Sequence, residues 1–270
     1  YKFHSTYLFH FMRILYLFSI IFTCITSSFS FAQQNENLWM RYTAISPNGT
    51  TIAFSYNSDI YAVPVSGGRA TRLTTHSAYD AKPVWSHDGS KIAFASNRHG
   101  NFDVFVMSAT GENVKRLTFN SADDWPSDFS RSNDAVWFNS IRRDSQNSLL
   151  FHKLGELYSV SLDAKMPKQL LSFPAYEARN NTQGDLLFEE IKGYEDEWRK
   201  HHTSSVTRDI WLKKASGEYQ KLSNFKGEDR NPVFGSNDHF YYLSEISGTF
   251  NVHQSTFTNI ITLNSCYSFC

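Results

Sequence analysis

An internal repeat runs through residues 38–259, and it constrains the fold of this chain more than any other feature of the sequence. The segment AISPNGTTIAF at 44–54 is echoed by VWSHDGSKIAF at 84–94, and three weaker copies follow. The copies are spaced 40, 44, 51 and 54 residues apart. Self-similarity of this period indicates one supersecondary unit that is repeated along the chain. The turn anchors of the five copies are Ser46, Ser86, Ser130, Asn181 and Gly235.

Two further markers recur at nearly fixed distances within each unit. An acidic residue followed by two apolar residues lies 14, 14, 14 and 13 residues before a leucine that closes the unit. The variation in period falls in one segment, between the phenylalanine of the turn motif and the acid. A constant framework with one elastic segment is typical of a repeated fold with loop insertions on one side. The acids are Asp59, Asp103, Glu156 and Asp209, and the leucines are Leu73, Leu117, Leu170 and Leu222.

Each unit is predicted to form four short strands, a to d. In the second unit they are expected at 82–85, 91–96, 103–107 and 113–118, because side chains alternate there and Gly, Asn or Asp occupies the turns. Four-stranded units without a helical segment favour an all-β fold, a β-propeller with antiparallel blades. A sandwich or meander with accidental similarity is the alternative. The predicted blades, about five in number, lie at about 39–76, 78–120, 122–174, 175–226 and 227–259.

Two long loops are predicted on one face of the propeller. In an up-and-down blade the b–c loops and the d-to-a links share a face, so the elastic segments all project from it. The longest, at 139–155 and 189–208, are predicted to contact a partner or form a lid. The histidines of the second loop could bind a metal, but a solvated mixed-charge loop is favoured because adjacent histidines rarely face the same way. The candidate partner residues are Glu195, Asp196, Glu197, Trp198, Arg199, His201 and His202.

Four carboxylates precede the first strands of successive blades, namely Asp80, Asp124, Glu177 and Asp229. Strand a lines the central channel of a propeller, so these residues are expected to surround one channel mouth. Their functional interpretation is an electrostatic filter for cationic or N-terminal groups of a peptide. The structural interpretation is that each acid caps a turn or accepts backbone N–H groups between blades, and the need for such acceptors favours it.

Composition and motifs exclude several function classes. Lysine plus arginine and aspartate plus glutamate both number 26, so the zero net charge argues against nucleic acid or an anionic membrane surface as partner. Three cysteines do not support a disulfide scaffold or a structural zinc site. No nucleophile elbow, phosphate-binding glycine loop or zinc-protease motif occurs in the sequence. We therefore predict no catalytic residue, no metal and no cofactor in this chain.

The two ends of the chain differ from the repeats. Met12, a positive Arg13 and an apolar run at 14–25 predict a signal peptide over 12–32, with cleavage before Gln33. Residues 1–11 are then upstream, non-native translation. The apolar run is short for a membrane span, so none is predicted, and a buried N-terminal helix is the alternative. The signal predicts a periplasmic or secreted protein.

The repeats resemble those of known propellers. The SPNG and SHDG turns, with ATRLT at 70–74 and VKRLT at 114–118, resemble the propeller repeats of TolB and related proteins. Other segments resemble the N-terminal propeller of tricorn-type proteases, and the resemblance covers about 38–252. The block at 193–211 is the most specific of them. The tricorn-like segments are 100–107, 121–126, 193–211 and 227–232.

The tricorn resemblance implies a six-bladed propeller that precedes a second propeller, a PDZ domain and a serine peptidase core. It also implies that the propeller guides peptides or unfolded polypeptide, that the downstream peptidase domains are its partners, and that the full-length protein is a homo-oligomer. Tricorn relatives without a signal are cytoplasmic, which is the alternative location. Only five repeats are visible, and 260–270 carries no marker, so a frameshift or premature stop and an aberrant tail are expected there.

Two functions follow as hypotheses. The first is the substrate-guiding propeller of a secreted serine peptidase whose catalytic part lies outside this chain. The second is a non-enzymatic, TolB-like propeller that binds proteins in the cell envelope. The propeller of a prolyl-oligopeptidase relative is a third and weaker possibility.

Overall fold

A computed structural model describes residues 39–142, 154–193, 203–236, 238–257 and 266–267. The described residues form β-strands joined by turns and loops, and this part of the chain contains no helix. All strand pairs are antiparallel. The predicted loop candidates from Glu195 to His202 lie outside the described residues, as do the predicted signal peptide and most of the tail.

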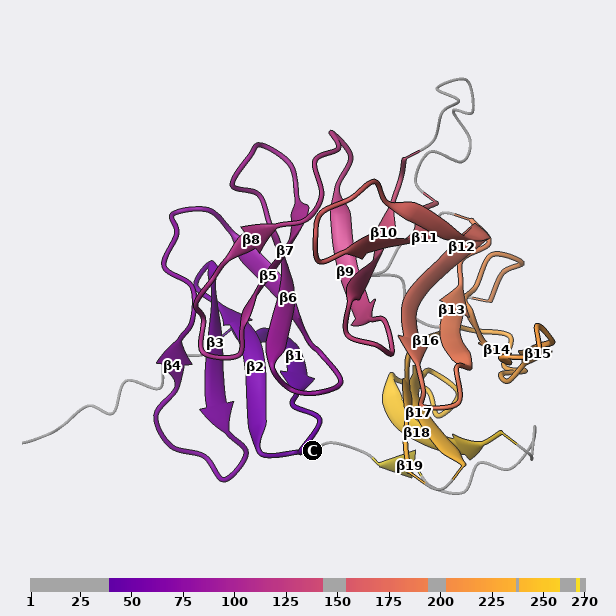
Figure 1. Ribbon diagram of the computed structural model, residues 1–270. Helices are drawn as coiled ribbons and strands as arrows, with labels where there is room; N and C mark the ends of the chain where they lie inside the picture. Colours follow the sequence, from indigo (N-terminus) through magenta and orange to yellow (C-terminus); the bar gives the residue numbers. More distant parts are fainter. Residues whose placement is uncertain (1–38, 143–153, 194–202, 237, 258–265, 268–270) are drawn as a thin grey trace, which may run out of the picture. The chain divides into compact units, whose positions relative to one another are not determined.

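The strands form sheets that follow one another in chain order (Figure 1). The first sheet has the order β1 (Arg41–Ile45), β2 (Thr51–Tyr56), β3 (Asp59–Pro64) and β4 (Thr71–Arg72). The second has the order β5 (Asp80–Trp85), β6 (Lys91–Ser96), β7 (Asp103–Ser108) and β8 (Lys115–Arg116). The last has the order β16 (Asp229–Phe234), β17 (His239–Ser244), β18 (Asn251–Thr256) and β19 (Cys266–Tyr267).

The third and fourth blades share one long strand and so form a seven-stranded sheet. The first half of β12 (Lys168–Asn180) pairs with β11 and its second half pairs with β13. The fourth strand of one blade therefore continues without a turn into the first strand of the next. The other members of this sheet are β9 (Asp124–Phe129), β10 (Ala135–Ser140), β11 (Glu156–Ser161), β13 (Leu186–Glu190), β14 (Asp209–Lys213) and β15 (Tyr219–Lys221).

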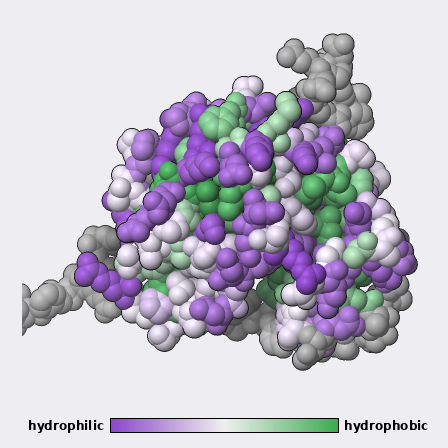
Figure 2. Space-filling model, in the orientation of Figure 1, coloured by the Kyte–Doolittle hydropathy of each residue, from purple (hydrophilic) through white to green (hydrophobic). Residues whose placement is uncertain are grey.

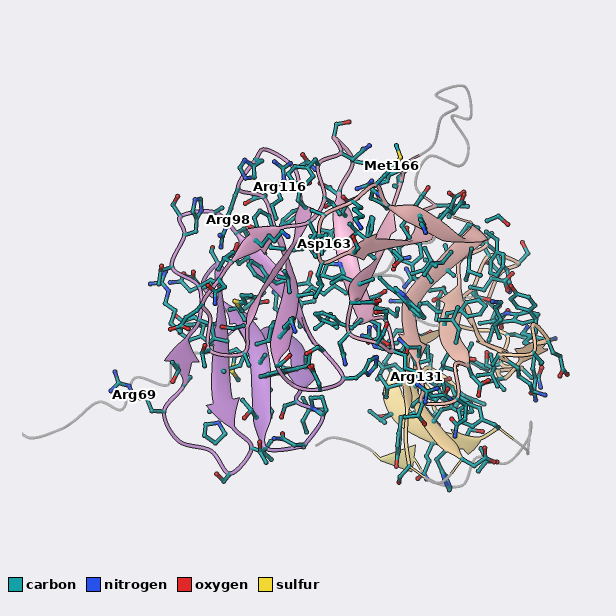
Figure 3. All side chains as sticks on the ribbon, viewed as in Figure 1. Arg69, Arg98, Arg116, Arg131, Asp163 and Met166 are labelled. Carbon is teal, nitrogen blue, oxygen red and sulfur yellow. The ribbon has the colours of Figure 1, made fainter. Side chains whose placement is uncertain are left out.

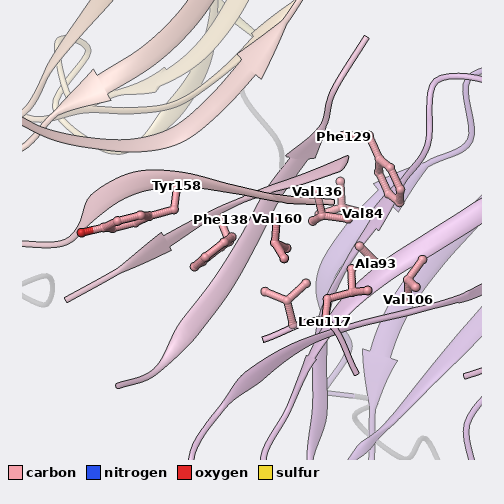
Figure 4. Close-up of a cluster of buried hydrophobic side chains, with 10 residues drawn as sticks. Val84, Ala93, Val106, Leu117, Phe129, Val136, Phe138, Tyr158 and Val160 are labelled. Carbon is pink, nitrogen blue, oxygen red and sulfur yellow. The ribbon is translucent and has the colours of Figure 1, made fainter. Parts of the chain in front are cut away.

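Neighbouring blades pack face to face through apolar side chains. The strands alternate side chains between their two faces, so each inner blade presents one apolar face to the blade before it and one to the blade after it. Between the second and third blades, for example, valine and alanine side chains of β5 to β7 meet aromatic and valine side chains of β9 to β11 (Figure 4). On the face drawn in Figure 2, hydrophobic residues are recessed between hydrophilic ones. The cluster in Figure 4 contains Val84, Ala93, Val104, Val106, Leu117, Phe129, Val136, Phe138, Tyr158 and Val160.

The repeated turn motif forms the connection between the first two strands of a blade. In the second blade, Ser86 Oγ and the Ser90 backbone N–H donate hydrogen bonds to Asp88 Oδ1 at 2.6 and 2.9 Å. These hydrogen bonds lower the pKa of Asp88 to about 2. Gly89 has a φ of 70°, a conformation that glycine adopts without steric cost. Asn48 accepts the same kind of hydrogen bonds in the first blade, so Asn and Asp have the same structural role at this position of the first two blades.

The acidic marker begins the third strand of a blade and holds the fourth strand against it. Asp103 is fully buried; its Oδ2 lies 2.7 Å from Arg116 Nη2 in an ion pair, and its Oδ1 accepts a hydrogen bond from Thr118 Oγ1 at 3.5 Å. Burial raises the pKa of Asp103 although Arg116 opposes the shift. Because Arg116 directly precedes Leu117, the cross-strand pairing fixes the distance from acid to leucine. The equivalent pairs are Asp59 with Arg72, Glu156 with Gln169, and Asp209 with Lys221.

In the third blade the marker leucine, Leu170, is exposed, and its neighbour is buried instead. Leu117 and Leu222 are buried as their position in the repeat predicts, but Leu170 is exposed and Leu171 is buried in its place. The pairing of β11 with β12 shifts register just beyond this point.

Candidate functional site

Strand a of four blades carries a β-bulge that lines a common cavity. At each bulge the ladder register shifts and one residue other than glycine has a positive φ. Such backbone conformations are costly for L-residues and tend to occur where function or tight packing requires them. Their φ values are 52° for Tyr42, 54° for Lys82, 46° for Glu177 and 51° for Asn231.

The cavity, which we call the axial cavity, has a volume of about 660 Å³. The first strands of all five blades contribute to its wall, and β1, β5, β9, β12 and β16 contact one another in this order. Its lining combines apolar side chains with a small charged group. The residues are Tyr42, Thr43, Ala44, Ile45, Pro47, Lys82, Pro83, Val84, Trp85, His87, Asp128, Glu177, Arg179, Asn231, Pro232 and Val233.

Glu177 is the centre of the charged group. Lys82 Nζ donates a hydrogen bond to Glu177 Oε1, and Arg179 Nη2 donates to Glu177 Oε2 at 3.2 Å. Burial pushes the pKa of Glu177 upward, but the charges of Lys82 and Arg179 outweigh it and hold this pKa below its ordinary value. The cluster thus places two cations around one carboxylate.

Asp128 is the second carboxylate on the axial cavity. Its Oδ1 accepts from the Phe129 backbone N–H at 2.8 Å, and its Oδ2 accepts from Asn180 N and Nδ2 at 2.8 and 3.0 Å. His87 Nε2 lies 3.7 Å from Asp128 Oδ1. Burial raises the pKa of Asp128, with Arg179 and these hydrogen bonds opposing the shift. Asp128 therefore joins β9 to β12 and is fully engaged within the protein.

A further ion-pair network lies behind the wall formed by β16. Arg208 Nη1 donates to Glu189 Oε1 at 3.2 Å, and Glu189 Oε2 accepts from the Asn231 backbone N–H at 2.9 Å. Burial raises the pKa of Glu189. Arg230 Nε donates to Glu228 at 2.9 Å. These contacts hold the bulge of β16 against the fourth blade.

The four carboxylates that the sequence singles out are not placed together. Glu177 alone lines the axial cavity, whereas Asp80, Asp124 and Asp229 are fully buried within their blades. Arg98 Nη2 lies 2.7 Å from Asp80 Oδ2, and Arg142 binds Asp124 in the same way. The cations that meet these aspartates come from the b–c loops of their own blades.

Asp229 differs from its two counterparts because no arginine of the described residues pairs with it. Neither of its carboxylate oxygens has a hydrogen-bond partner within the described part of the chain. In each of these blades the aspartate pairs with a serine of the second strand. The residue two positions after that serine is Arg98 in the second blade and Arg142 in the third, but Ile246 in the fifth. Burial raises the pKa of Asp229 to about 7; the Ser244 and Ser223 hydroxyl groups are near enough to oppose this shift but do not meet hydrogen-bond geometry, so burial dominates.

The residues that do line the axial cavity lie two positions after the buried aspartates. Lys82 follows Asp80 by two residues, Asn231 follows Asp229 in the same way, and each precedes a proline. In β12 the counterpart of Asp80 is Ala175, which has the same place in the strand pairing. Glu177, two residues later, is therefore the counterpart of Lys82 and lines the cavity. The X-Pro pair after each acid is the sequence signal that could have located the bulge.

A second cavity, of about 880 Å³, lies beside the turns that join the first and second strands of the blades. His87 lines both cavities, so the two are adjacent at this residue. The lining of the second cavity is rich in amide side chains of the turn at 180–183, together with Phe234 and Phe257.

The described residues contain neither a metal-binding cluster nor a membrane-spanning helix. No group of three or more His, Cys, Asp or Glu side chains in the described ranges is arranged to hold a metal ion. No helix long and apolar enough to cross a membrane occurs in the part of the chain that the structure covers.

The fold and the axial cavity define the class of the protein: it is a β-propeller of four-stranded antiparallel blades. The sequence profile of the tricorn protease N-terminal β-propeller domain matches residues 37–261. The chain therefore belongs to this family, and the resemblance detected in the sequence is confirmed. No curated protein matches the sequence.

Solved structures share the fold at low sequence identity. The crystal structure of the tricorn protease superposes with a TM-score of 0.67 at 17% identity, over 81% of this chain and 21% of the protease. A TolB-like protein from Agrobacterium tumefaciens gives a TM-score of 0.65 at 14% identity, over 82% of this chain and 78% of that protein. A puromycin-hydrolyzing peptidase from Mycobacterium tuberculosis gives 0.57 at 13% identity, over 83% and 37%. The chain thus spans about a fifth of the tricorn protease.

Proposed function

We propose that this chain is the substrate-guiding propeller of a tricorn-like serine peptidase and that it binds extended peptides in the axial cavity. The observation that carries the proposal is the cavity itself, which the inner strands of all five blades surround. Ligand sites are typically concave, largely apolar and supplied with a few fixed polar groups. The axial cavity combines these features.

The lining suits a peptide better than a small polar metabolite. Trp85, Val84 and Val233 offer apolar surface for side chains, and the charged group around Glu177 offers a polar contact. The volume of about 660 Å³ accommodates a few residues of an extended chain. A site of this kind binds polypeptide segments without performing chemistry on them.

Membership of the tricorn propeller family supports the link to proteolysis. The partners in this proposal are peptides or unfolded polypeptide and the peptidase domains of a longer protein, which assembles as a homo-oligomer. The catalytic residues belong to those domains.

A TolB-like binding function is the second candidate, because this chain spans 78% of the similar TolB-like protein but only 21% of the tricorn protease. Such a propeller would bind a folded partner rather than an extended peptide. Recovery of one folded partner by the purified chain, with no affinity for unstructured peptides, would favour this candidate.

Blocking the axial cavity is expected to abolish peptide binding. Val233 lines the cavity and is 41% exposed, so Val233→Trp fills space without disturbing the core. We expect the affinity for a fluorescein-labelled, unstructured octapeptide to fall at least about tenfold in fluorescence anisotropy titrations. Val114→Trp is the matched control, since Val114 is also 41% exposed but lies outside the cavity. Equal loss in both variants, or no loss in Val233→Trp, would contradict the proposal.

The proposed location is outside the cytoplasm, in the periplasm or the medium. The basis is the sequence of residues 12–32, which has the order of a signal peptide. Expression in a bacterial host is expected to yield exported protein that begins at Gln33, as read by N-terminal sequencing. Retention of the uncleaved chain in the cytoplasm would instead support the location of tricorn relatives without a signal.

A further inference from the structure

We propose that the axial cavity recognises its peptide through a carboxylate, with Lys82 and Arg179 as the anchoring cations. This inference deepens the proposed function and rests on it. It concerns the chemical class of the ligand group, which a peptide can supply either at its C-terminus or as an acidic side chain.

Lys82 and Arg179 carry hydrogen-bond donors that the described part of the protein does not use. The Lys82 ammonium has three N–H donors, and Glu177 Oε1 accepts one of them. Arg179 donates from Nη2 to Glu177, but its Nη1 is buried and has no partner within the described residues. A buried donor without an acceptor is costly, so this group favours a ligand that supplies an acceptor. The cavity therefore holds spare donors on both cations.

The carboxylate oxygens of the axial cavity, in contrast, already accept hydrogen bonds from the protein. Both oxygens of Glu177 are engaged, one by Lys82 and the other by Arg179. Both oxygens of Asp128 are also engaged, by backbone and side-chain N–H groups of Phe129 and Asn180. A cationic ligand would meet the like charges of Lys82 and Arg179 beside Glu177, whereas a carboxylate ligand would be attracted by both cations and would accept from their spare donors.

The two cations are partly shielded from water. The Lys82 and Arg179 side chains are 15% and 27% exposed, and Val84, Trp85 and Pro232 contribute apolar surface beside them. Ion pairs in such a partly desolvated site are stronger than on an open surface, and arginine can bind a carboxylate with two parallel hydrogen bonds. The same walls would accept the apolar side chain next to the carboxylate.

The proposal reverses the expectation drawn from the sequence alone. A set of carboxylates around the channel predicted a filter for cationic or N-terminal groups. The structure buries three of those carboxylates within blades and surrounds the fourth, Glu177, with cations. Within this charged group, the hydrogen-bonding groups left for a ligand are N–H donors of Lys82 and Arg179.

The experiment compares unlabelled octapeptides of one sequence as competitors of the fluorescein-labelled peptide. The first peptide has a free C-terminal carboxylate, the second a C-terminal amide, the third an acetylated N-terminus, and the fourth a C-terminal amide with one internal glutamate. We expect the carboxylate peptide to bind at least about tenfold more tightly than the amide. N-terminal acetylation is expected to change the affinity by less than about twofold.

A variant tests the residue assignment. Arg179→Gln is expected to reduce the preference for carboxylate over amide to less than about threefold. Arg69→Gln is the control, because Arg69 is exposed and lies outside the cavity (Figure 3). If Arg179→Gln does not fold, as judged by circular dichroism, the comparison of carboxylate and amide peptides on the unmodified chain still decides the proposal.

The outcomes separate this inference from the function on which it rests. If no peptide binds, the proposed function itself fails. If carboxylate and amide peptides bind equally, or if acetylation of the N-terminus causes the larger loss, the chain binds peptides but carboxylate recognition is overturned. If the internal glutamate restores the affinity of the amide, the inference holds and the acidic side chain is a sufficient source of the carboxylate.

Discussion

Replacing Arg98 by methionine is expected to lower the free energy of unfolding by about 3–5 kcal/mol at pH 7. Arg98 Nη2 lies 2.7 Å from Asp80 Oδ2, and Asp80 is fully buried. The guanidinium also lies over the rings of Phe94 and Phe105, at 5.5 and 5.1 Å from their centroids. Methionine retains part of this packing but leaves the aspartate as an uncompensated buried charge. Urea denaturation of the two proteins measures the difference.

Two comparisons identify the buried charge as the cause. The double variant Asp80→Asn with Arg98→Met is expected to recover most of the lost stability, because it removes both charges. Arg69→Met, at an exposed arginine, is expected to change the free energy of unfolding by less than about 0.5 kcal/mol (Figure 3). A loss below about 1 kcal/mol in Arg98→Met would show that the pair contributes no more than a surface ion pair does.

Replacing Asp229 by asparagine is expected to stabilise the protein at alkaline pH, the opposite of the usual effect of a core substitution. Burial raises the pKa of Asp229 from 3.8 to about 7 in the folded protein. Unfolding returns this pKa to its ordinary value, so the unfolded chain loses the proton first as the pH rises. The wild-type protein therefore loses stability between about pH 4 and pH 7, and the loss approaches about 4 kcal/mol above pH 7.

The difference between Asp229→Asn and wild type isolates this effect from other titrating groups. We expect the two proteins to have similar stability at about pH 4 and to differ by up to about 4 kcal/mol at pH 8, in urea titrations at each pH. Asp80→Asn is the matched control at the same position of another blade, and it is expected to destabilise because it leaves Arg98 buried without its partner. A difference between Asp229→Asn and wild type that does not change with pH would contradict the raised pKa.

The opposite expectations for Asp80 and Asp229 arise from one residue of the b–c loop. Arg98 and Arg142 reach the buried aspartates of the second and third blades, whereas Ile246 occupies the equivalent position in the fifth. The aspartate is repeated in the sequence, but its partner lies in the segment whose length varies between blades. Sequence spacing alone therefore does not reveal which aspartate has a cation.

Much of the fold could be predicted because its signals are local. The Ser-x-Asp-Gly turn forms through hydrogen bonds between residues a few positions apart, such as those from Ser86 and Ser90 to Asp88. The acid and the leucine of each unit are linked by one cross-strand pairing, as between Asp103 and Arg116. The four-stranded blades follow from these contacts, and the strands of the second blade match the predicted ranges closely.

The candidate site could be predicted only in part, because it is assembled by bulges. An alternating strand would direct Asp80 and Lys82 to the same face. The bulge after Ala81 shifts the register, so that Asp80 is buried within the blade while Lys82 lines the axial cavity. The Lys82–Glu177 contact then joins residues 95 positions apart, which no local pattern encodes.

The sequence by itself determined the repeating unit, its strands and turns and its membership of the tricorn propeller family, because each depends on neighbouring residues or on one hairpin. Only the tertiary structure decided which charged groups meet. The reason is physical: the sign of the field in the axial cavity depends on how five separate strands a are placed around it, and on which buried carboxylates find a cation there.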